Sequence, residues 1–118
     1  MAIEWSEGIV VADLADEPAL SDELNTLHDR LADADAGAAP SMVVSFEAVS
    51  YINSSNIAQL LRLRKRLSEL GTEMVLAGVN GEIKEVLAIT GLDRVFTITP
   101  DKLTALASLQ LGDAGEEV

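Results

Sequence analysis

Two adjacent serines stand where an apolar segment gives way to an amphipathic one, in the stretch Ser50–Leu61, which reads SYINSSNIAQLL. Ser54 and Ser55 lie between Asn53 and Asn56. The first N–H groups of a helix have no partner inside the helix, and one Ser or Asn at the N-cap position satisfies part of this need. Four such side chains are more than a junction between a strand and a helix requires. Either the turn is difficult to build, or one of the hydroxyls is used.

A hydroxyl at the start of a helix is a suitable acceptor for a phosphate. The phosphate would meet free N–H donors and the positive end of the helix dipole, and it would add about −1.5 to −2 of charge to the surface. A residue of this kind can act as a switch. The alternative is structural, in that Ser54 or Ser55 simply caps the helix. Spacing alone does not separate the two.

Catalysis by one of these serines would require a base, and the chain offers few candidates. His28 is the only histidine, and its neighbours one turn away, Leu24 and Leu31, indicate a residue at the boundary of the core. The chain has no cysteine and no set of acids at metal-ligand spacing. The segment VNGEIKEV has one glycine and an acid at the start of its helix, unlike a loop that cradles phosphate. We expect no catalytic residue, metal or cofactor, and keep a small hydrolase or nucleotide-binding enzyme with Ser55 as nucleophile as a remote alternative.

The charge of the chain points to a protein partner. A net charge of −12 argues against direct binding to nucleic acid and to an anionic membrane, since both need a basic surface. Four of the eight basic residues lie together in the sequence RLRKR, residues 62–66. We expect Arg62, Lys65 and Arg66 to face away from the core as a docking patch for a partner. An ordinary solvated helix face is the alternative.

Apolar patterning predicts an α/β fold. Buried strands are expected at residues 8–14, 42–46, 74–79 and 95–98, with residues 3–5 as a short edge strand or hairpin arm. Helices alternate with the strands from the middle of the chain onward, which predicts a mixed, mostly parallel sheet of about four to five strands with four helices. In such sheets ligands bind at the carboxyl ends of strands, and the junction at residues 53–56 lies at one of these ends.

The ends and inward faces of the helices follow from cap residues and leucine spacing. Ser21 is the expected cap of the first helix, Gly71 and Gly91 end the second and third, and Thr99 caps the fourth with Pro100 at its first position. The residues expected to face inward are Leu20, Leu24, Leu27 and Leu31, then Leu60, Leu63, Leu67 and Leu70, then Ile83, Val86 and Leu87, and finally Leu103, Leu106 and Leu109.

Four stretches carry a resemblance to a known family. They read VSYINSSN, IAQLLRLRKRLSELG, EMVLAGV and IKEVLAITGLDRVFTI. From residue 42 to about residue 109 the chain resembles a STAS domain, the family of bacterial anti-sigma factor antagonists. The family pattern runs V-x-[YF]-[IM]-D-S-S-G, a Leu-rich basic helix ending in Gly, and [EK]-x-V-L-x-[IL]-T-G-L-x-x-[VI]-F. The stretch TGLDRVF is the most specific match, whereas the first forty residues match only in the order of their elements.

The resemblance implies a STAS-type fold and assigns roles to the turn. In phosphorylatable members the acceptor is the second Ser or Thr of the D-S-S-G turn, which corresponds to Ser55, with Asn53, Ser54 and Asn56 as the rest of the switch turn. Asn53 stands where the family has Asp, and it removes a charge that could orient the hydroxyl or the metal of the kinase nucleotide. Asn56 stands where the family has Gly, and we expect its side chain to lie where the partner approaches.

Taken together, these patterns predict one cytoplasmic STAS domain over residues 1–111, followed by an acidic, disordered tail at residues 112–118. The amino terminus begins with acids where a signal peptide has bases. The expected function is that of an anti-anti-sigma factor, a non-enzymatic switch that binds an anti-sigma serine kinase, is regulated by phosphorylation at Ser55 and is restored by a serine phosphatase. The main alternative is a STAS scaffold subunit of a larger regulatory or transporter assembly that is not phosphorylated.

Overall fold

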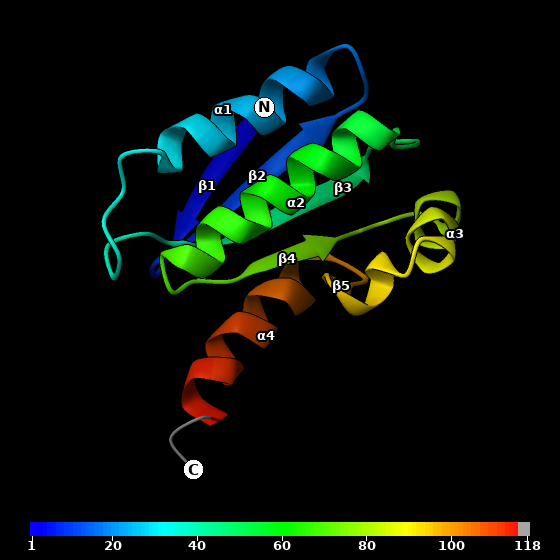
Figure 1. The fold of residues 1–118 in the computed structure, drawn as a ribbon. Helices are drawn as coiled ribbons and strands as arrows, with labels where there is room; N and C mark the ends of the chain where they lie inside the picture. The colour runs from blue at the N-terminus through cyan, green and yellow to red at the C-terminus, as the bar shows by residue number, and fades with distance from the viewer. Residues whose placement is uncertain (116–118) are drawn as a thin grey trace.

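The computed structural model describes residues 1–115 as one α/β unit (Figure 1). Its elements are β1 (Ala2–Ser6), β2 (Ile9–Ala15), α1 (Ala19–Leu31), β3 (Ser41–Ala48), α2 (Ser54–Glu69), β4 (Met74–Ala77), α3 (Gly81–Ile89), the 3-10 helix η1 (Leu92–Arg94), β5 (Thr97–Thr99) and α4 (Lys102–Gly115). The order of strands and helices is the one that the sequence predicts. The last strand is shorter and begins later than expected, because residues 92–94 form a helical turn before it.

The strands form one sheet in the order β1-β2-β3-β4-β5. β1 pairs antiparallel with β2, and the other neighbouring pairs are parallel, which confirms the mixed, mostly parallel sheet and the hairpin arm. Since β2, β3 and β4 run in the same direction, the turns that follow them meet at one edge of the sheet. This edge carries the Asn53–Asn56 turn.

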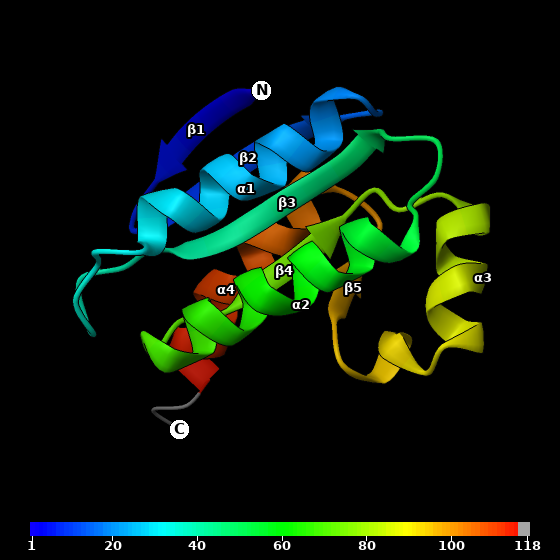
Figure 2. The ribbon, with the colours of Figure 1, turned by 45° about the horizontal axis from the view of Figure 1, so that its top comes forward.

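Helices cover the two faces of the sheet unequally. α1 and α2 pack beside each other on one face, whereas α4 is the only helix on the other within residues 1–115 (Figure 2). The strands are therefore apolar on both sides, as the near-continuous apolar run of β3 indicates. The predicted stripes of α1 and α2 are confirmed, since all of their residues are buried, namely Leu20, Leu24, Leu27, Leu31, Leu60, Leu63, Leu67 and Leu70.

Glycines end two of the helices as predicted. Gly71 has a φ of +81° and follows the last turn of α2, where its N–H donates to the carbonyl oxygen of Ser68. Gly91 has a φ of +78° and follows α3. Both positions lie in the left-handed region, which a residue with a side chain adopts only with strain. These two turns therefore fix where β4 and η1 begin.

The start of α1 differs from the prediction. α1 begins at Ala19, and Ser21 is inside its first turn. The N–H and the hydroxyl of Ser21 both donate to the carboxylate of Glu17, over 2.7 and 2.6 Å. A carboxylate accepts both bonds at once and favours the positive end of the helix, so Glu17 takes the role expected of Ser21.

The fourth helix also begins later than predicted, and of its three predicted inward residues Leu109 is buried, Leu106 is partly buried and Leu103 is exposed. Thr99 ends β5, and the carboxylate of Asp101 accepts a hydrogen bond from the N–H of Thr104 over 2.7 Å, so Asp101 is the capping side chain. Ala105 and Leu109 are buried against the sheet, while Leu103 is 77% exposed. The helix packs on the sheet through Ala105 and Leu109, with Leu106 partly buried beside them, and Lys102 at its start forms an ion pair with Asp13 of β2 over 3.1 Å.

Helix α4 continues past the position at which the tail was expected to begin. It runs to Gly115, and residues 116–118 of the predicted tail lie outside the described residues. The disorder of the tail stays a prediction. None of the helices in the described part of the chain combines the length and the apolar character needed to cross a membrane.

The buried stripe of α2 gives a direct test of the fold. Leu63 is fully buried between α2 and the sheet, so we expect Leu63→Ala to lower the free energy of unfolding by about 2–5 kcal/mol. Lys65→Ala, an exposed change on the same helix, should alter it by less than about 0.5 kcal/mol. Urea unfolding of both variants measures the difference. Equal small losses would show that α2 does not pack through Leu63.

Candidate functional site

The turn before α2 is capped by its two asparagines. The side-chain oxygen of Asn53 accepts from the backbone N–H of Asn56 over 2.9 Å, and the side-chain oxygen of Asn56 accepts from the backbone N–H of Asn53 over 3.0 Å. This reciprocal pair is a capping box. The structural alternative for the serines, in which Ser54 or Ser55 caps the helix, is therefore wrong. The polar run contains more side chains than the cap needs, and the surplus is the serine pair.

Both serine hydroxyls are exposed at the start of α2. Ser54 and Ser55 are its first two residues, and within the described residues neither hydroxyl makes a hydrogen bond to the protein. The N–H groups of the first helical turn have no acceptor inside the helix, and they lie at the positive end of its dipole. A negative group attached to either hydroxyl would be favoured at this position.

Ser55 differs from Ser54 in what lies beside it. Ser55 lines a shallow hollow of about 440 Å³ between α1 and α2, together with Ser21, Asn25, Ala58, Gln59 and Arg62. The amide nitrogen of Gln59 donates to the carbonyl oxygen of Ser21 and to the side-chain oxygen of Asn25, over 3.0 and 3.1 Å. These bonds tie the two helices together across the hollow. The structure thus brings Ser55 and Arg62 to one rigid surface and leaves Ser54 outside it.

Asn56 is buried, contrary to the expectation that it lies where a partner approaches. Its residue exposure is 0%, and its amide nitrogen points toward the hydroxyl of Ser21 and the side-chain oxygen of Gln59, at 3.5 and 3.4 Å. Asn56 is the third residue of α2 and has helical backbone angles, so this position does not demand glycine. The capping box turns its side chain inward, toward α1.

Two residues that sequence reasoning missed hold the turn in place. The carboxylate of Asp16 accepts from the N–H and the hydroxyl of Ser50, each over 2.7 Å. The amide nitrogen of Asn80 donates to the carbonyl oxygens of Val49 and Ser50, over 3.3 and 2.8 Å. Asp16 follows β2 and Asn80 precedes α3, so the turn after β3 is pinned by the turns on both sides of it. Their position after neighbouring parallel strands is the signal that could have identified them.

The bonds from Ser50 also act on the charge of Asp16. They hold the pKa of the Asp16 carboxyl below its ordinary value of 3.8, mainly through the backbone N–H of Ser50 and then through its hydroxyl. The folded state therefore favours the carboxylate. A depressed pKa contributes stability that is present above 3.8 and is lost as the pH falls through the lower pKa of the folded protein.

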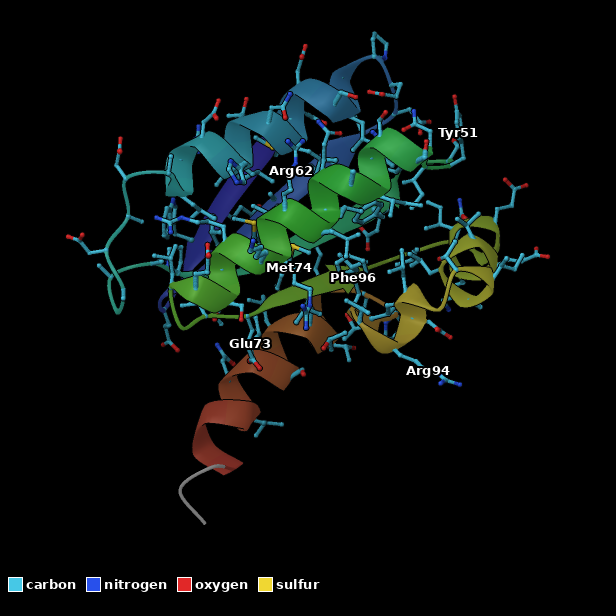
Figure 3. The ribbon with its side chains drawn as sticks, in the orientation of Figure 1. Tyr51, Arg62, Glu73, Met74, Arg94 and Phe96 are labelled. Carbon is cyan, nitrogen blue, oxygen red and sulfur yellow. The ribbon has the colours of Figure 1, made fainter. Side chains whose placement is uncertain are left out.

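Sequence reasoning also missed Tyr51. Its side chain is 57% exposed at the apex of the pinned turn, next to the amino-terminal end of α2. Figure 3 shows Tyr51 beyond that end of the helix and Arg62 on its outward side, toward α1. An exposed aromatic side chain on a fixed turn widens the surface around Ser55.

The basic residues of α2 do not form one patch. Arg62 and Lys65 are exposed, as expected, but Arg66 is half-buried. Its guanidinium donates to the carbonyl oxygens of Leu31, Ala32 and Ala34, over 3.1, 3.1 and 3.2 Å. These carbonyls lie at and after the end of α1, where helical carbonyls have no partner inside the helix. The expectation that Arg66 faces away from the core as part of a docking patch is corrected, because its side chain turns back to the end of α1.

No group of three or more His, Cys, Asp and Glu side chains in the described residues is arranged to hold a metal ion. His28 does not line the hollow beside Ser55. The chemistry that this surface offers is therefore a free hydroxyl at a helix start, an exposed aromatic ring and two exposed cations.

The family model of the STAS domain matches residues 13–105 of the chain. Curated protein sequences give no match.

Solved structures of low sequence identity share the fold. A STAS domain protein from Planctomyces limnophilus, described as an anti-sigma-factor antagonist, is 23% identical, with a TM-score of 0.75 over 92% of this chain and 97% of that one. The STAS domain of a SulP transporter from Vibrio cholerae is 16% identical, with a TM-score of 0.78 over 94% and 88%. The Bacillus cell fate determinant SpoIIAA in its phosphorylated form is 18% identical, with a TM-score of 0.66 over 90% and 96%.

The contacts of Arg66 predict a structural role for this residue. We expect Arg66→Ala to lower the free energy of unfolding by about 1–3 kcal/mol, because it removes the three hydrogen bonds that join α2 to the end of α1. Arg64→Ala removes an exposed arginine from the same helix and should cost less than about 0.5 kcal/mol. Chemical denaturation compares the two. A loss for Arg66→Ala as small as that for Arg64→Ala would contradict the assignment.

The Asp16–Ser50 bonds predict a pH-dependent contribution to stability. Asp16→Ala should lower the melting temperature at pH 7, and the difference from the unsubstituted protein should shrink as the pH falls below 3.8, where the carboxylate is progressively protonated. Asp33→Ala, an exposed change beyond α1, serves as the control. Thermal unfolding from neutral to acidic pH measures the effect. A difference that stays constant down to acidic pH would rule out the charged form of Asp16 as its source.

Proposed function

The chain belongs to the STAS domain family, and we propose that it acts as an anti-anti-sigma factor, a switch that works through protein binding. In the unmodified state it binds an anti-sigma serine kinase, and phosphorylation of Ser55 releases that partner. A serine phosphatase restores the binding form. The proposal requires neither a cofactor nor direct contact with nucleic acid, which suits a net charge of −12.

The observation that carries the proposal is the unused hydroxyl of Ser55. Ser55 is exposed in the first turn of a helix that Asn53 and Asn56 cap. It lines the same hollow as Arg62. A phosphate at this place would leave the capping bonds intact. The folded protein would therefore accept the modification without losing the turn.

The charges suggest how the modification would act. Arg62 and Lys65 are exposed on an otherwise acidic protein, so the complementary partner surface is acidic. A phosphate on Ser55 would bring about −1.5 to −2 of charge next to Arg62. It would offset the positive charge that attracts the partner and repel the acidic partner surface. Binding would weaken without a change of fold.

The surface around Ser55 also supports binding over catalysis. A serine nucleophile needs a base within hydrogen-bonding reach. Apart from Ala58, the residues that share the hollow with Ser55 are Ser21, Asn25, Gln59 and Arg62, none of which is a usual general base, and His28 is not among them. Tyr51 and Arg62, by contrast, are exposed and belong to residue types that are enriched at the centres of protein interfaces.

One residue favours a second candidate function, a STAS scaffold that is not phosphorylated. Asn53 stands where the family pattern has Asp, and a carboxylate near the acceptor could take up the hydroxyl proton or organise the metal and nucleotide of the kinase. Asn53 keeps the cap without supplying this charge. Similar solved structures include one of the stressosome, described as a signal integration and transduction hub, the STAS domain of a SulP transporter and a sulfate transporter family protein, so the fold also occurs in larger assemblies.

Phosphate transfer to Ser55 is the prediction that tests the first candidate. Incubation with the cognate anti-sigma kinase and ATP should phosphorylate Ser55 both in the unsubstituted protein and in the Ser54→Ala variant. The Ser55→Ala variant should remain unlabelled. Mass spectrometry of the peptides locates the phosphate. Asn53→Asp keeps a side-chain acceptor for the cap and should raise the rate of labelling, with partner affinity unchanged within about tenfold, or 1.4 kcal/mol.

Two results would contradict this assignment. Label on Ser54, with Ser55→Ala still modified, would overturn the choice of acceptor. Absence of label in both the unsubstituted protein and Asn53→Asp, while both bind the kinase, would leave the scaffold as the function.

A further inference from the structure

Helix α4 is the only helix on its face of the sheet in the described residues. Ala105 and Leu109 pack on β3 and β4, while α1 and α2 occupy the opposite face (Figure 2). The surface of α4 that points away from the sheet therefore has no neighbouring helix in this chain. The character of that surface decides what can cover it.

The outward side of α4 carries no charge along an apolar stripe, which the exposed polar side chains of Thr104, Ser108 and Gln110 flank. Leu103 and Leu111 are 77% and 69% exposed, and Ala107 lies midway between them and is half-buried. The spacing of four residues places the three side chains along one stripe of the helix. No charged residue occurs between Lys102 and Asp113, although charged residues make up 24% of the chain. An exposed apolar stripe without charge is typical of an interaction surface.

We propose that this stripe, Leu103–Ala107–Leu111, is the interface between two copies of the chain, with their α4 helices packed antiparallel. The stripe is self-complementary about its centre. When two such helices cross at Ala107, Leu103 of each copy lies level with Leu111 of the other, so every leucine meets a leucine. The methyl side chain of Ala107 at the crossing point lets the helices approach closely, since the distance between helix axes depends on the side chains at the contact.

The charge of the protein favours this surface over the other exposed apolar residues. Each copy carries a net charge of −12, so a second copy is repelled wherever carboxylates would face one another. Trp5 follows Glu4 on β1 and is two residues from Glu7, and Ile89 lies one turn from the exposed Glu85. The stripe on α4 has no acid between its leucines, and the nearest acids along the chain, Asp101 and Asp113, lie beyond its two ends, so no carboxylates oppose one another within the stripe itself.

The arrangement leaves the proposed partner-binding surface free. Ser55 and Arg62 lie on the face of α1 and α2, and α4 lies on the opposite side of the sheet. A dimer through α4 would present the two Ser55 surfaces on its outer sides. It could engage two partner molecules or a partner dimer, which raises the effective affinity through multivalency. The inference does not depend on whether Ser55 is phosphorylated.

The interface should be weak and should respond to salt. The stripe is about 12 Å long at 1.5 Å per residue and is smaller than a standard interface, so we expect a dissociation constant on the order of 100 µM. Raising NaCl from about 0.05 to 0.5 M screens the repulsion between the acidic copies and should tighten the dimer several-fold. Sedimentation equilibrium of the full chain, from about 10 µM to 1 mM, measures both effects.

Matched aspartate variants locate the interface. Leu103→Asp and Leu111→Asp place a carboxylate in the contact and should each weaken the dimer more than about tenfold. Ile89→Asp makes the same change at an equally exposed site on α3 and should leave the association constant unchanged. Circular dichroism of all three variants should match that of the unsubstituted protein, because the substituted side chains are exposed.

Three outcomes would overturn the proposal. The first is a monomer at every concentration and salt level. The second is a dimer that Leu103→Asp and Leu111→Asp leave unaffected. The third is a dimer that Ile89→Asp disrupts as strongly as they do. None of these results depends on a kinase, so they do not bear on the role of Ser55.

Discussion

The reciprocal hydrogen bonds between Asn53 and Asn56 are the constraint on which the candidate site depends. In these bonds the two side-chain oxygens accept from backbone N–H groups at the start of α2. The adjacent hydroxyls of Ser54 and Ser55 therefore stay free. Burial of Asn56 also joins this cap to α1, because its amide nitrogen points toward Ser21 and Gln59. A cap made by a serine would have used the group that the proposed switch needs. The division of roles between asparagines and serines thus explains why the junction contains four polar residues in a row.

The sheet supplies the second requirement, a turn that hydrogen bonds from both neighbouring turns hold in place. Three parallel strands end at the same edge, which places Asp16 and Asn80 each within hydrogen-bonding distance of Ser50. Tyr51 and Ser55 are therefore presented from a fixed base, and a binding partner need not order them first. The same rigidity suits a switch that acts by charge. A phosphate on Ser55 would alter the electrostatics of the surface while the bonds beneath it remain.

Much of the fold could be predicted from the sequence, because its signals are local and periodic. The leucine stripes of α1 and α2, the glycine at the end of α2 and the alternation of strands and helices fix the main layers. The errors arose where a contact joins distant segments. Glu17 replaced Ser21 as the first cap, and Arg66 reached the end of α1, thirty-two to thirty-five residues away, which no pattern within one helix could indicate. Leu103 is likewise exposed because α4 packs on strands from distant parts of the chain through Ala105 and Leu109.

The contacts of the turn could be predicted only in part. Family resemblance predicts Ser55 as the acceptor, which stays a prediction, whereas which side chains cap the helix follows from distances alone. The most direct measurement is therefore the free energy of unfolding of Asn53→Ala beside that of Ser54→Ala and Ser55→Ala. The account predicts a loss of about 0.5–2 kcal/mol for Asn53→Ala and less than about 0.5 kcal/mol for each serine variant. A loss at either serine as large as that at Asn53 would mean that the hydroxyl caps the helix, and the switch would lose its physical basis.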